Sequence, residues 1–485
     1  MLLLGLLAAV HVFIFSATFP FFNVVDEQDH LDLVVRYSEG DLPRTLTPPS
    51  AGALPFIAIY GTPEYINAPA ALGGSIPPPP WREPINDVRA KLLAKEGAYQ
   101  ALFKNHEASQ PPLYYALGGA WWRCGKILGF DGGGLLYWLR FLNVFFVVAL
   151  VWVGRRAALN IFPENKFIQV AVPAFIALMP QTVFYSINND VLSPVMFGLV
   201  FLWLMKFLEA EVPGPRLAAA LGLAMAGTFL TKISNLPLLA LAGLFLGWKI
   251  IQLARQGKLA ATFPALGILA VCGGLPVVAW MVWCKKNFGD FTGSILKIQF
   301  LGWTYKPFGE WFHHPIFTPG GLWFFISKNL STFWQGEFLW QGKPLASTGV
   351  DEFYVLLTLV VLLAAGTVLV RRRPPLSSMQ RRAIGFGLAA VAAMFAFFAL
   401  LSVKYDFQDC FYPSRAHPYF TSGRLMLGML VPFLLVFALG LDRLLGQAGK
   451  REKFTVLAVL LLVMLGAEIA VDWRIFPNEY NWFHL

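Results

Sequence analysis

A dense group of acidic residues follows the first apolar run of the chain. No Asp, Glu, Lys or Arg occurs from residue 1 to 25, and then Asp26, Glu27, Asp29 and Asp32 come within seven positions, with His30 among them. An apolar helix that ends in such a group places the carboxylates at a membrane surface. Partial loss of solvent there raises the pKa of a carboxylic acid, so general-base catalysis at neutral pH becomes possible. The alternative is a solvated helix end with no chemical role.

The composition around this group is that of an integral membrane protein. Only 14% of the 485 residues are charged and 57% are hydrophobic, whereas soluble domains carry about 25% charged residues. The net charge of +10 does not indicate a nucleic-acid-binding protein, because Lys and Arg occur in short clusters between apolar runs. The four cysteines have no CxxC spacing, which indicates neither a zinc knuckle nor a disulfide framework.

Eleven apolar runs have about the length that a bilayer requires. They lie at residues 1–22, 135–154, 167–187, 190–208, 216–231, 233–251, 262–284, 353–370, 383–403, 423–445 and 455–472. We therefore predict an all-α polytopic bundle of about 11 transmembrane helices, which forms a single membrane domain over residues 1–485. The first run lacks the basic start and small-residue cleavage site of a signal peptide, so we interpret it as a retained span.

Clusters of Lys and Arg predict the orientation of these spans. They lie at residues 155–166, 206–216, 249–258, 371–382 and 443–453, between alternate pairs of spans, as in cytoplasmic loops. The N-terminus is then inside and the C-terminus outside. Three loops, at residues 23–134, 285–352 and 404–422, are then expected on the outer side.

Parts of these outer loops are expected to be short helices at the membrane surface. Residues 111–122 are apolar but too short to span, which suits an interfacial or re-entrant helix. Leu and Ala alternate with charges in Asp87–Lys104, and Ser331–Trp340 has the amphipathic pattern of a helix on the outer membrane surface. The Pro-rich stretch that includes Pro77 to Pro80 is expected to be loop or polyproline.

Several ionisable residues fall at the outer ends of the predicted spans. The cations are Arg140, Lys232, Lys404 and Arg424, and Asp190 follows Asn189 at the turn between the third and fourth spans. The bilayer makes such residues costly, so they are candidates for function. Cations that share a membrane face with Asp26 suit a lipid-linked phosphate beside a general base. The alternatives are snorkelling to headgroups for the cations and helix capping for Asp190.

Other polar residues of the first outer loop could reach the same pocket. His30 follows Glu27 by three positions, so one helical face could hold both. The candidates for acceptor or metal contacts are His30, His106, Glu107, Asn189 and Asp190, and those for the substrate pocket are Gln110, Tyr114 and Tyr115. A divalent metal ion on Glu27, His30 or Asp190 is an open alternative, because the ligand spacing is not diagnostic.

Taken in order, these motifs resemble those of the GT-C superfamily of membrane glycosyltransferases, which includes protein O-mannosyltransferases and aminoarabinose transferases. Asp26-Glu27 after the first span is similar to their first-loop acidic motif, and Asn189-Asp190 to their second acidic site. Gln110-Pro111-Pro112-Leu113 resembles their His-Pro-Pro-Leu segment, with Gln110 where His is commoner. Thr231-Lys232 and Gly423-Arg424 are similar to motifs of a bacterial branch.

The resemblance implies a GT-C-like fold and transfer of a sugar from a polyprenyl-phosphate donor to a glycan, lipid or protein acceptor. Asp26 would be the general base of an inverting displacement, with Glu27 as its catalytic neighbour. Arg140, Lys232, Lys404 and Arg424 would hold the donor phosphate. The site would face the extracytoplasmic side of a bacterial inner membrane. The departure at Gln110 puts in doubt any role that a histidine there would fill.

Two other functions fit an outer pocket of charge. One is a flippase or secondary transporter of lipid-linked sugars, although transporters place their site near the midplane and often contain internal repeats. Here the charges lie at the outer ends of the spans, and the sequence has no visible repeat. The other is a polymerase or ligase of lipid-linked glycans, which would share the outer-face geometry.

Overall fold

The computed structural model describes residues 1–61, 74, 78–82, 87–100, 102–341, 343–371, 375–410 and 412–485. Its α-helices are α1 (Leu2–Thr18), α2 (Glu27–Glu39), α3 (Leu54–Tyr60), α5 (Asp87–Gln100), α6 (Leu113–Ile127), α7 (Gly132–Arg140), α8 (Leu142–Ile161), α9 (Lys166–Ala177), α10 (Ser193–Glu209), α11 (Pro215–Thr231), α12 (Leu236–Arg255), α13 (Leu259–Phe288), α14 (Ser294–Phe300), α15 (Pro319–Gln335), α16 (Thr348–Arg371), α17 (Ser378–Lys404), α18 (Leu430–Leu444) and α19 (Lys450–Asp472). Short 3₁₀ helices are η2 (Pro80–Arg82), η3 (Thr182–Tyr185), η4 (Asn189–Val191), η5 (Ile233–Asn235), η6 (Phe308–His313), η7 (Pro315–Phe317), η8 (Gly423–Met429) and η9 (Trp482–His484).

Eight helical stretches in the described part of the chain are long and apolar enough to cross a membrane. They cover residues 132–161, 189–209, 233–255, 259–288, 348–370, 378–404, 423–444 and 450–472. The other three predicted spans fall on α1, α9 and α11, which are shorter apolar helices of 17, 12 and 17 residues. The all-α membrane class is confirmed, whereas the count of eleven stays a prediction.

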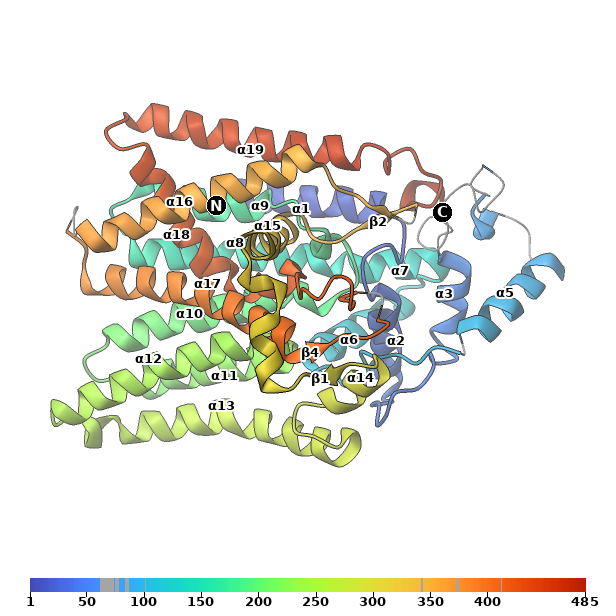
Figure 1. Cartoon of the computed structure of the whole chain (residues 1–485), viewed down its shortest axis with the longest axis horizontal. Helices are drawn as coiled ribbons and strands as arrows, with labels where there is room; N and C mark the ends of the chain where they lie inside the picture. Colours follow the sequence, from blue (N-terminus) through green and yellow to red (C-terminus); the bar gives the residue numbers. More distant parts are fainter. Residues whose placement is uncertain are drawn as a thin grey trace.

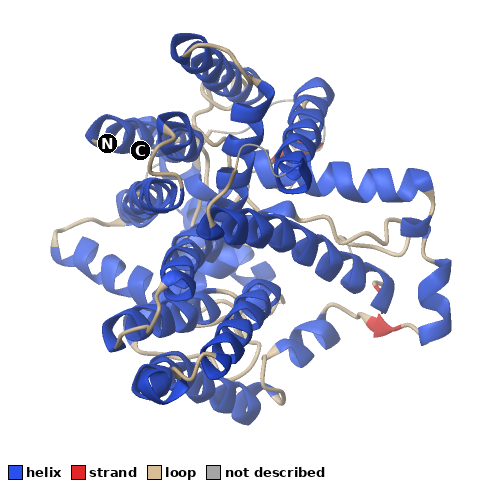
Figure 2. Cartoon of the chain, turned by 90° about the vertical axis from the view of Figure 1, so that its left-hand side faces the viewer, coloured by secondary structure: helices blue, strands red, loops and turns tan. Residues whose placement is uncertain are grey.

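The long helices run side by side along the longest axis of the molecule (Figure 1), and many are seen nearly end-on from one end (Figure 2). Helices α2, α3, α5 and α14 gather at the opposite end from that view. Helix α18 lies in the interior, and every residue from Leu430 to Leu441 is buried. A helix that is apolar on all sides is expected to be buried on all sides, as α18 is.

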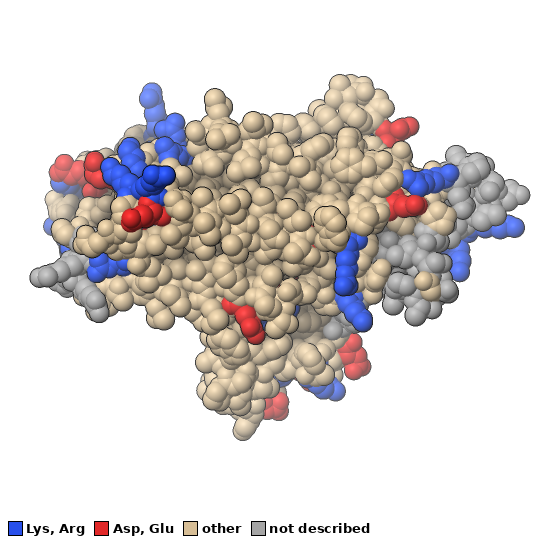
Figure 3. Space-filling model, turned by 90° about the horizontal axis from the view of Figure 1, so that it is seen from above, with Lys and Arg blue, Asp and Glu red and all other residues tan. Residues whose placement is uncertain are grey.

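On the face of the molecule seen from above (Figure 3), charged side chains are few in the middle and gather toward the ends. In Figure 3 a broad band of uncharged residues separates two ends that carry Lys, Arg, Asp and Glu, and Lys and Arg gather most at one end. Large apolar side chains of the long helices are also exposed, as Phe263 and Leu275 of α13 illustrate with 72% and 66% exposure. Such a band suits lipid, because lipid offers charged groups no hydrogen bonds.

Two predicted spans differ from the observed helices. The second is interrupted at Phe141, which separates α7 from α8. The third was expected over residues 167–187, but its helix ends at Ala177. Pro180 has no backbone N–H and cannot continue a helix. The chain instead turns through η3 and η4, and this turn carries Asp190 to the start of α10.

Short β pairs connect the loops at the end of the molecule that holds α2. The strands are β1 (Thr304–Tyr305) with β4 (Tyr405–Asp406), and β2 (Leu339–Trp340) with β3 (Lys343–Pro344), both antiparallel. A single bridge also pairs Val24 with Phe338. The segment that follows α15 therefore lies next to the start of α2.

The predicted loop helices have different outcomes. The α5 helix confirms the expected helix that begins at Asp87, and α6, with 15 residues, is not among the possible spans. The surface position of Ser331–Trp340 is wrong, because residues 331–334 end α15 and are buried. The rings of Phe333 and Trp334 pack against Phe433 of α18, at centroid distances of 4.9 and 5.8 Å. Pro77 and the basic residues at 372–373 lie outside the described residues.

Candidate active site

Asp26 occupies an unusual backbone position at the start of α2. It is the N-cap residue, but its φ of 66° is left-handed and its side chain caps no backbone N–H of the helix. This conformation is uncommon for residues other than Gly, and strain of this kind gathers at functional sites. The carboxylate is turned toward residues from distant parts of the chain.

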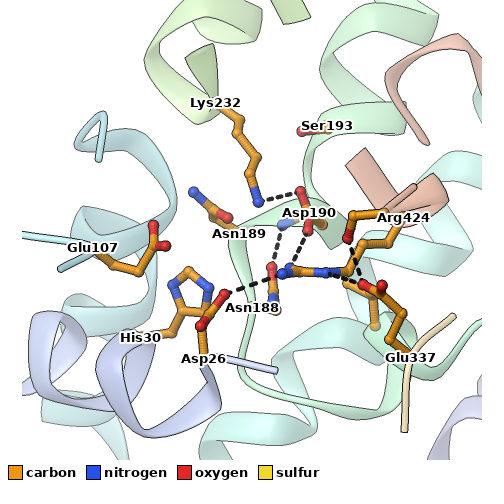
Figure 4. A network of polar contacts seen from close by, with 12 residues as sticks. Asp26, His30, Glu107, Asn188, Asn189, Asp190, Ser193, Lys232, Glu337 and Arg424 are labelled. Carbon is orange, nitrogen blue, oxygen red and sulfur yellow. Dashed lines mark hydrogen bonds and ion pairs between the residues drawn. The ribbon is translucent and has the colours of Figure 1, made fainter. Parts of the chain in front are cut away.

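Arg424 binds three carboxylates at once. Its guanidinium donates to Asp26 Oδ2 at 3.1 Å, Asp190 Oδ2 at 2.9 Å and Glu337 Oε2 at 2.8 Å. Figure 4 shows the guanidinium between the three acids. Arg424 belongs to η8 before α18, Asp190 to η4 before α10, and Glu337 follows α15. Four segments far apart in sequence thus meet at one cation.

Lys232 adds a second cation from the turn between α11 and η5. Its Nζ lies 2.5 Å from Asp190 Oδ1, and the side chains are 7% and 1% exposed. The side chain of Asn188 holds the turn that presents Asp190, because its oxygen accepts the backbone N–H of Asp190 at 2.9 Å. The structure therefore brings together four of the predicted site residues, namely Asp26, Asp190, Lys232 and Arg424.

A second polar group contacts Asp26 through His106. The Nε2 of His106 lies 3.4 Å from Asp26 Oδ1, and its Nδ1 lies 2.9 Å from Asp29 Oδ2. Glu107 Oε1 lies 3.3 Å from His106 Nε2, and Lys297 of α14 pairs with the same carboxylate. Asp26 and Asp29 are three positions apart at the start of α2, so one imidazole can reach both.

The neighbours of each group decide its pKa. Burial disfavours charged His106, but its contacts with Asp26 and Asp29 outweigh burial and raise the pKa to about 10. Burial alone would raise the pKa of Asp26, but His106 and Arg424 hold it well below its usual range. The expected rise in the Asp26 pKa is therefore wrong. Asp26 is charged at neutral pH and is a weak base in this arrangement.

Glu27 and Arg140 form a closed ion pair. Both side chains are 0% exposed, and Nε and Nη2 of Arg140 each donate to a Glu27 carboxylate oxygen at 2.8 Å. The other donors of Arg140 reach the backbone carbonyls of Ser16, Phe19 and Pro20. Glu27 also accepts two backbone N–H groups, those of Phe22 and Ile187. This geometry corrects two expectations: Arg140 has no donor left for a phosphate, and Glu27 is not placed for catalysis or metal binding.

The remaining first-loop candidates line the same region. The Nδ1 of His30 lies 2.8 Å from the Tyr115 hydroxyl, and burial lowers the His30 pKa to about 4, which leaves a neutral imidazole. Figure 4 places His30 beside Asp26 and Glu107. Its Nε2 has no hydrogen-bond partner among the described residues. Tyr114 is fully buried.

Gln110 and Asn189 link the two polar groups. Gln110 donates to the Glu107 carboxylate, and its own side-chain oxygen accepts from Asn189 at 3.4 Å. Asn189 also donates to the Thr231 carbonyl at 3.2 Å, next to Lys232 in the chain. Because an amide is both donor and acceptor, these two side chains can link neighbouring polar groups and fix their positions.

Lys404 does not join this site in the structure. Its ammonium lies over the rings of Tyr305 and Tyr405, at 5.1 and 5.2 Å from their centroids. These contacts fix the end of α17 beside the β1–β4 pair. The expected role of Lys404 in phosphate binding has no geometric support in the described residues.

Three residues of the site were not predicted: Asp29, Lys297 and Glu337. Asp29 was visible as part of the acidic group, but its face of α2 was not. Glu337 carries the clearest sequence signal, because it is the one carboxylate between Glu310 and Asp351 and stands in an aromatic segment. An isolated charge in an apolar segment indicates a function.

The carboxylates of the site outnumber its cations. The acids are Asp26, Asp29, Glu107, Asp190 and Glu337, and the cations are Lys232, Lys297 and Arg424. A protonated His106 still leaves one carboxylate in excess. Each of the three cations is already paired, so an anionic ligand must displace a carboxylate or meet an additional cation here.

Asp26, Asp29 and His106 could hold such a cation. They offer ligand atoms that lie within 4.8 Å of one another. Two carboxylates and an imidazole suit a divalent ion such as Zn²⁺ or Mn²⁺. This set differs from the expected one, since Glu27 is bound to Arg140, and Asp190 to Lys232 and Arg424.

Comparison with known proteins identifies the family. The sequence model of the family described as "Predicted membrane protein (DUF2142)" matches residues 10–405. The chain belongs to this family. Every residue of the Asp26 site except Arg424 lies within the matched part. No curated protein matches the sequence.

Among solved structures, the chain is similar to the archaeal oligosaccharyltransferase AglB from Archaeoglobus fulgidus, solved in complex with an inhibitory peptide and a dolichol-phosphate. The identity is 11% and the TM-score is 0.41. The likeness covers 98% of this chain and 56% of the AglB chain, so the chain spans little more than half the length of that protein. A likeness at this score supports no conclusion about the chemistry of the site.

Proposed function

We propose that this protein is a membrane glycosyltransferase that moves a sugar from a lipid-linked phosphate donor to an acceptor hydroxyl. The observation that carries the proposal is the Asp26–Arg424–Asp190–Lys232 cluster at the ends of the spans. A carboxylate for the acceptor stands there beside two cations for a leaving phosphate. Glycosyl transfer with inversion needs this combination.

The proposed reaction is a single displacement. The acceptor hydroxyl gives its proton to an oxygen of Asp26 as its own oxygen attacks the anomeric carbon. The bond from that carbon to the phosphate oxygen breaks, and the lipid phosphate leaves with both electrons. Because the low pKa of Asp26 makes it a weak base, proton transfer accompanies attack and does not precede it.

Arg424 and Lys232 are the proposed phosphate ligands. Arg424 presents a planar fork that matches phosphate oxygens, and Lys232 supplies a compact charge. Both are held by Asp190, so the donor phosphate would take over part of these contacts. His30 and Asn189 are placed to contact the acceptor, because each has a buried polar atom without a partner in the described residues.

A divalent ion fits this proposal. Asp26, Asp29 and His106 would hold it, and it would supply positive charge for the phosphate. His106 would then have to give up its proton. The excess of carboxylates in the site supports this extra cation.

The membrane arrangement is part of the proposal. The chain would form one polytopic domain with eleven spans, with the N-terminus inside and the loops at 23–134, 285–352 and 404–422 on the extracytoplasmic side of a bacterial inner membrane. In intact cells, a cysteine that replaces Leu42 should react with an impermeant reagent, and one that replaces Ser377 should not. The reverse result would overturn this orientation.

Substitution of Asp26 tests the enzyme activity. Asp26→Asn keeps size and hydrogen bonding but removes the base, so transfer from a polyprenyl-phosphate sugar should fall by about 10²–10⁴-fold. The assay uses the protein in nanodiscs. Mass spectrometry of the lipids that co-purify with it identifies the class of donor to add. Asp409→Asn, an exposed Asp in an outer loop, is the matched control and should keep full activity.

Three results would change the proposal. If Asp26→Asn is active while Asp190→Asn is inactive, Asp190 is the base. If neither change matters and the protein moves an intact lipid-linked sugar between leaflets, it is a flippase. Loss of activity in Asp409→Asn would show that the assay reports folding rather than chemistry.

A further inference from the structure

A separate cavity lies between the loop that follows α2 and the end of α13. It has a volume of about 300 Å³, at the low end of the range for small-ligand sites. Its polar lining comes from Arg36, Asp41, Arg44, Thr45 and Thr47, and the indole of Trp283 forms one wall. Figure 1 shows the end of α13 on the same side of the molecule as α2.

Arg36 builds the wall of this cavity and is not free to bind a ligand. Its guanidinium donates to Asp32 at 3.0 Å, Asp41 at 2.7 Å, Thr47 at 3.0 Å and the Pro48 carbonyl at 2.8 Å. Both ends of the loop are thus tied to one side chain. The shape of the cavity is therefore set before any ligand arrives.

Arg44 is the opposite case. Its side chain is exposed and lies over the ring of Trp283, 6.0 Å from the centroid. It has no hydrogen bond or ion pair with any described residue. The Nε1 of Trp283 is buried and also has no partner in the described part of the chain. An unpaired guanidinium and an indole ring offer an anion and a flat apolar ring two matched contacts.

The cavity is connected to the candidate active site. Asn105 precedes His106, and its backbone N–H donates to the Thr47 carbonyl at 2.8 Å. Its side chain donates to Asp32 at 2.9 Å, and to the carbonyl of Asp29 at 2.9 Å. Arg36 follows Asp26 by ten helical positions, which is about 15 Å along α2. A ligand that reached both places would have to extend over about this distance.

We propose that this cavity binds an anionic sugar of the acceptor glycan, one that carries a carboxylate or phosphate. Trp283 would contact the sugar ring, Arg44 its anionic group, and Asp41, Thr45 and Thr47 its hydroxyls. This inference rests on the proposed function, because the acceptor must extend from Asp26 to the cavity. The phosphate of a lipid headgroup offers Arg44 the same chemistry, but the hydroxyl and carboxylate groups of the lining favour a sugar.

The test measures binding to the full chain without transfer. The protein, labelled with 5-fluorotryptophan, is placed in nanodiscs of phosphatidylcholine, and Trp283→Phe assigns the ¹⁹F signal of Trp283. An oligosaccharide of glucuronic acid should shift this signal, and it should bind about tenfold or more tightly than a neutral oligosaccharide of glucose. Arg44→Gln should remove the difference between the two sugars. Arg415→Gln, a change at an exposed arginine bound to Asp406, should leave it intact.

Equal binding of the two sugars, or an Arg44→Gln protein that still prefers the acid, would overturn the proposal. A shift of the Trp283 signal by phosphatidylglycerol in the nanodisc, with loss of sugar binding, would identify a lipid site instead. Asp26→Asn separates this inference from the proposed function. This variant should lose transfer by about 10²–10⁴-fold and keep the ¹⁹F shift. If the unmodified protein shows the shift but no transfer, that result contradicts only the proposed function.

Discussion

Asp26 and Glu27 are neighbours in the chain, yet they belong to opposite kinds of site. Glu27 and its partner Arg140 are 0% exposed, whereas the side chain of Asp26 is 19% exposed and that of His106 is 22% exposed. Four donors enclose the Glu27 carboxylate. The Asp26 carboxylate instead belongs to an open cluster of charges with Asp190, Lys232 and Arg424. The comparison indicates that Glu27 builds the frame of the site and that Asp26 is available for chemistry.

The charge balance around Arg140 differs from that around Arg424, and this difference supports the same division. Arg140 meets one carboxylate and three carbonyl oxygens, so its pair with Glu27 is neutral and complete. Arg424 meets three carboxylates, so its surroundings keep negative charge. A buried pair is stable only when its hydrogen bonds are all made. An excess of one sign is useful only where a ligand completes it.

Breaking the closed pair should have the largest effect, and on stability. Glu27→Gln leaves Arg140 buried without its counter-charge, which costs about 3–5 kcal/mol of folding free energy. Thermal unfolding in detergent should show a large fall in melting temperature for Glu27→Gln and for Arg140→Gln. Asp26→Asn, a change at the neighbouring position, should unfold at a temperature close to that of the unmodified protein.

The double change Glu27→Gln with Arg140→Met is the control for this prediction. It removes both charges, so it should recover part of the stability that either single change loses. If Glu27→Gln folds normally but loses transfer, Glu27 has a role in the reaction, and the division between frame and chemistry is wrong.

The open cluster should lose ligand affinity when its Arg424 cation is changed. Arg424→Gln would remove a charge-assisted hydrogen bond to the proposed donor phosphate, and such a bond contributes about 1.5–3 kcal/mol of binding free energy. Arg424→Lys keeps the charge but cannot bridge three carboxylates. Its affinity for the phosphate should therefore lie between those of the unmodified protein and Arg424→Gln. Binding of a polyprenyl phosphate, measured by calorimetry in nanodiscs, checks both. Unchanged affinity in Arg424→Gln would remove Arg424 from the phosphate site.

The sequence predicted the open cluster better than the closed pair, for a physical reason. Asp26, Asp190, Lys232 and Arg424 are charges at the ends of apolar runs, and the bilayer makes such charges conspicuous. Arg140 has the same signature, but its partner depends on how α7 packs against the start of α2. Hydropathy reports depth in the membrane and does not report which side chains meet.

The helices show a similar limit. Each predicted span overlaps an apolar helix, because length and hydropathy follow from the thickness of the bilayer. The early end of α9 depends on Pro180 and on Gln181, whose side chain donates to the carbonyl of Phe333 at 2.7 Å. That contact joins the end of α15 to the turn that follows α9, and residues 331–334 of α15 are buried rather than at the surface. Glu337 enters the site by the same packing, which no local pattern reveals.

His106 should make stability depend on pH when the site holds no metal. Its pKa of about 10 in the folded protein exceeds the usual 6.5, so its contribution is full below about pH 6.5 and is lost as pH rises through 10. Partial exposure reduces this to roughly 1–2 kcal/mol. In chelator-treated protein, the melting temperature should fall between pH 7 and 10, and His106→Gln should flatten that fall. A bound divalent ion should flatten it too, because it replaces the proton.

Lys404 gives the smallest expected effect and limits the extent of the open cluster. The sequence placed it with Arg424, but the structure holds its ammonium over Tyr305 and Tyr405. Loss of these contacts in Lys404→Ala should cost about 0.5–1 kcal/mol of stability, as for cation–π contacts near the surface. Affinity for polyprenyl phosphate should not change, because Lys404 contacts none of the carboxylates that Arg424 bridges. A loss of affinity as large as that of Arg424→Gln would mean that the phosphate site reaches the end of α17, and Lys404 would then be part of it.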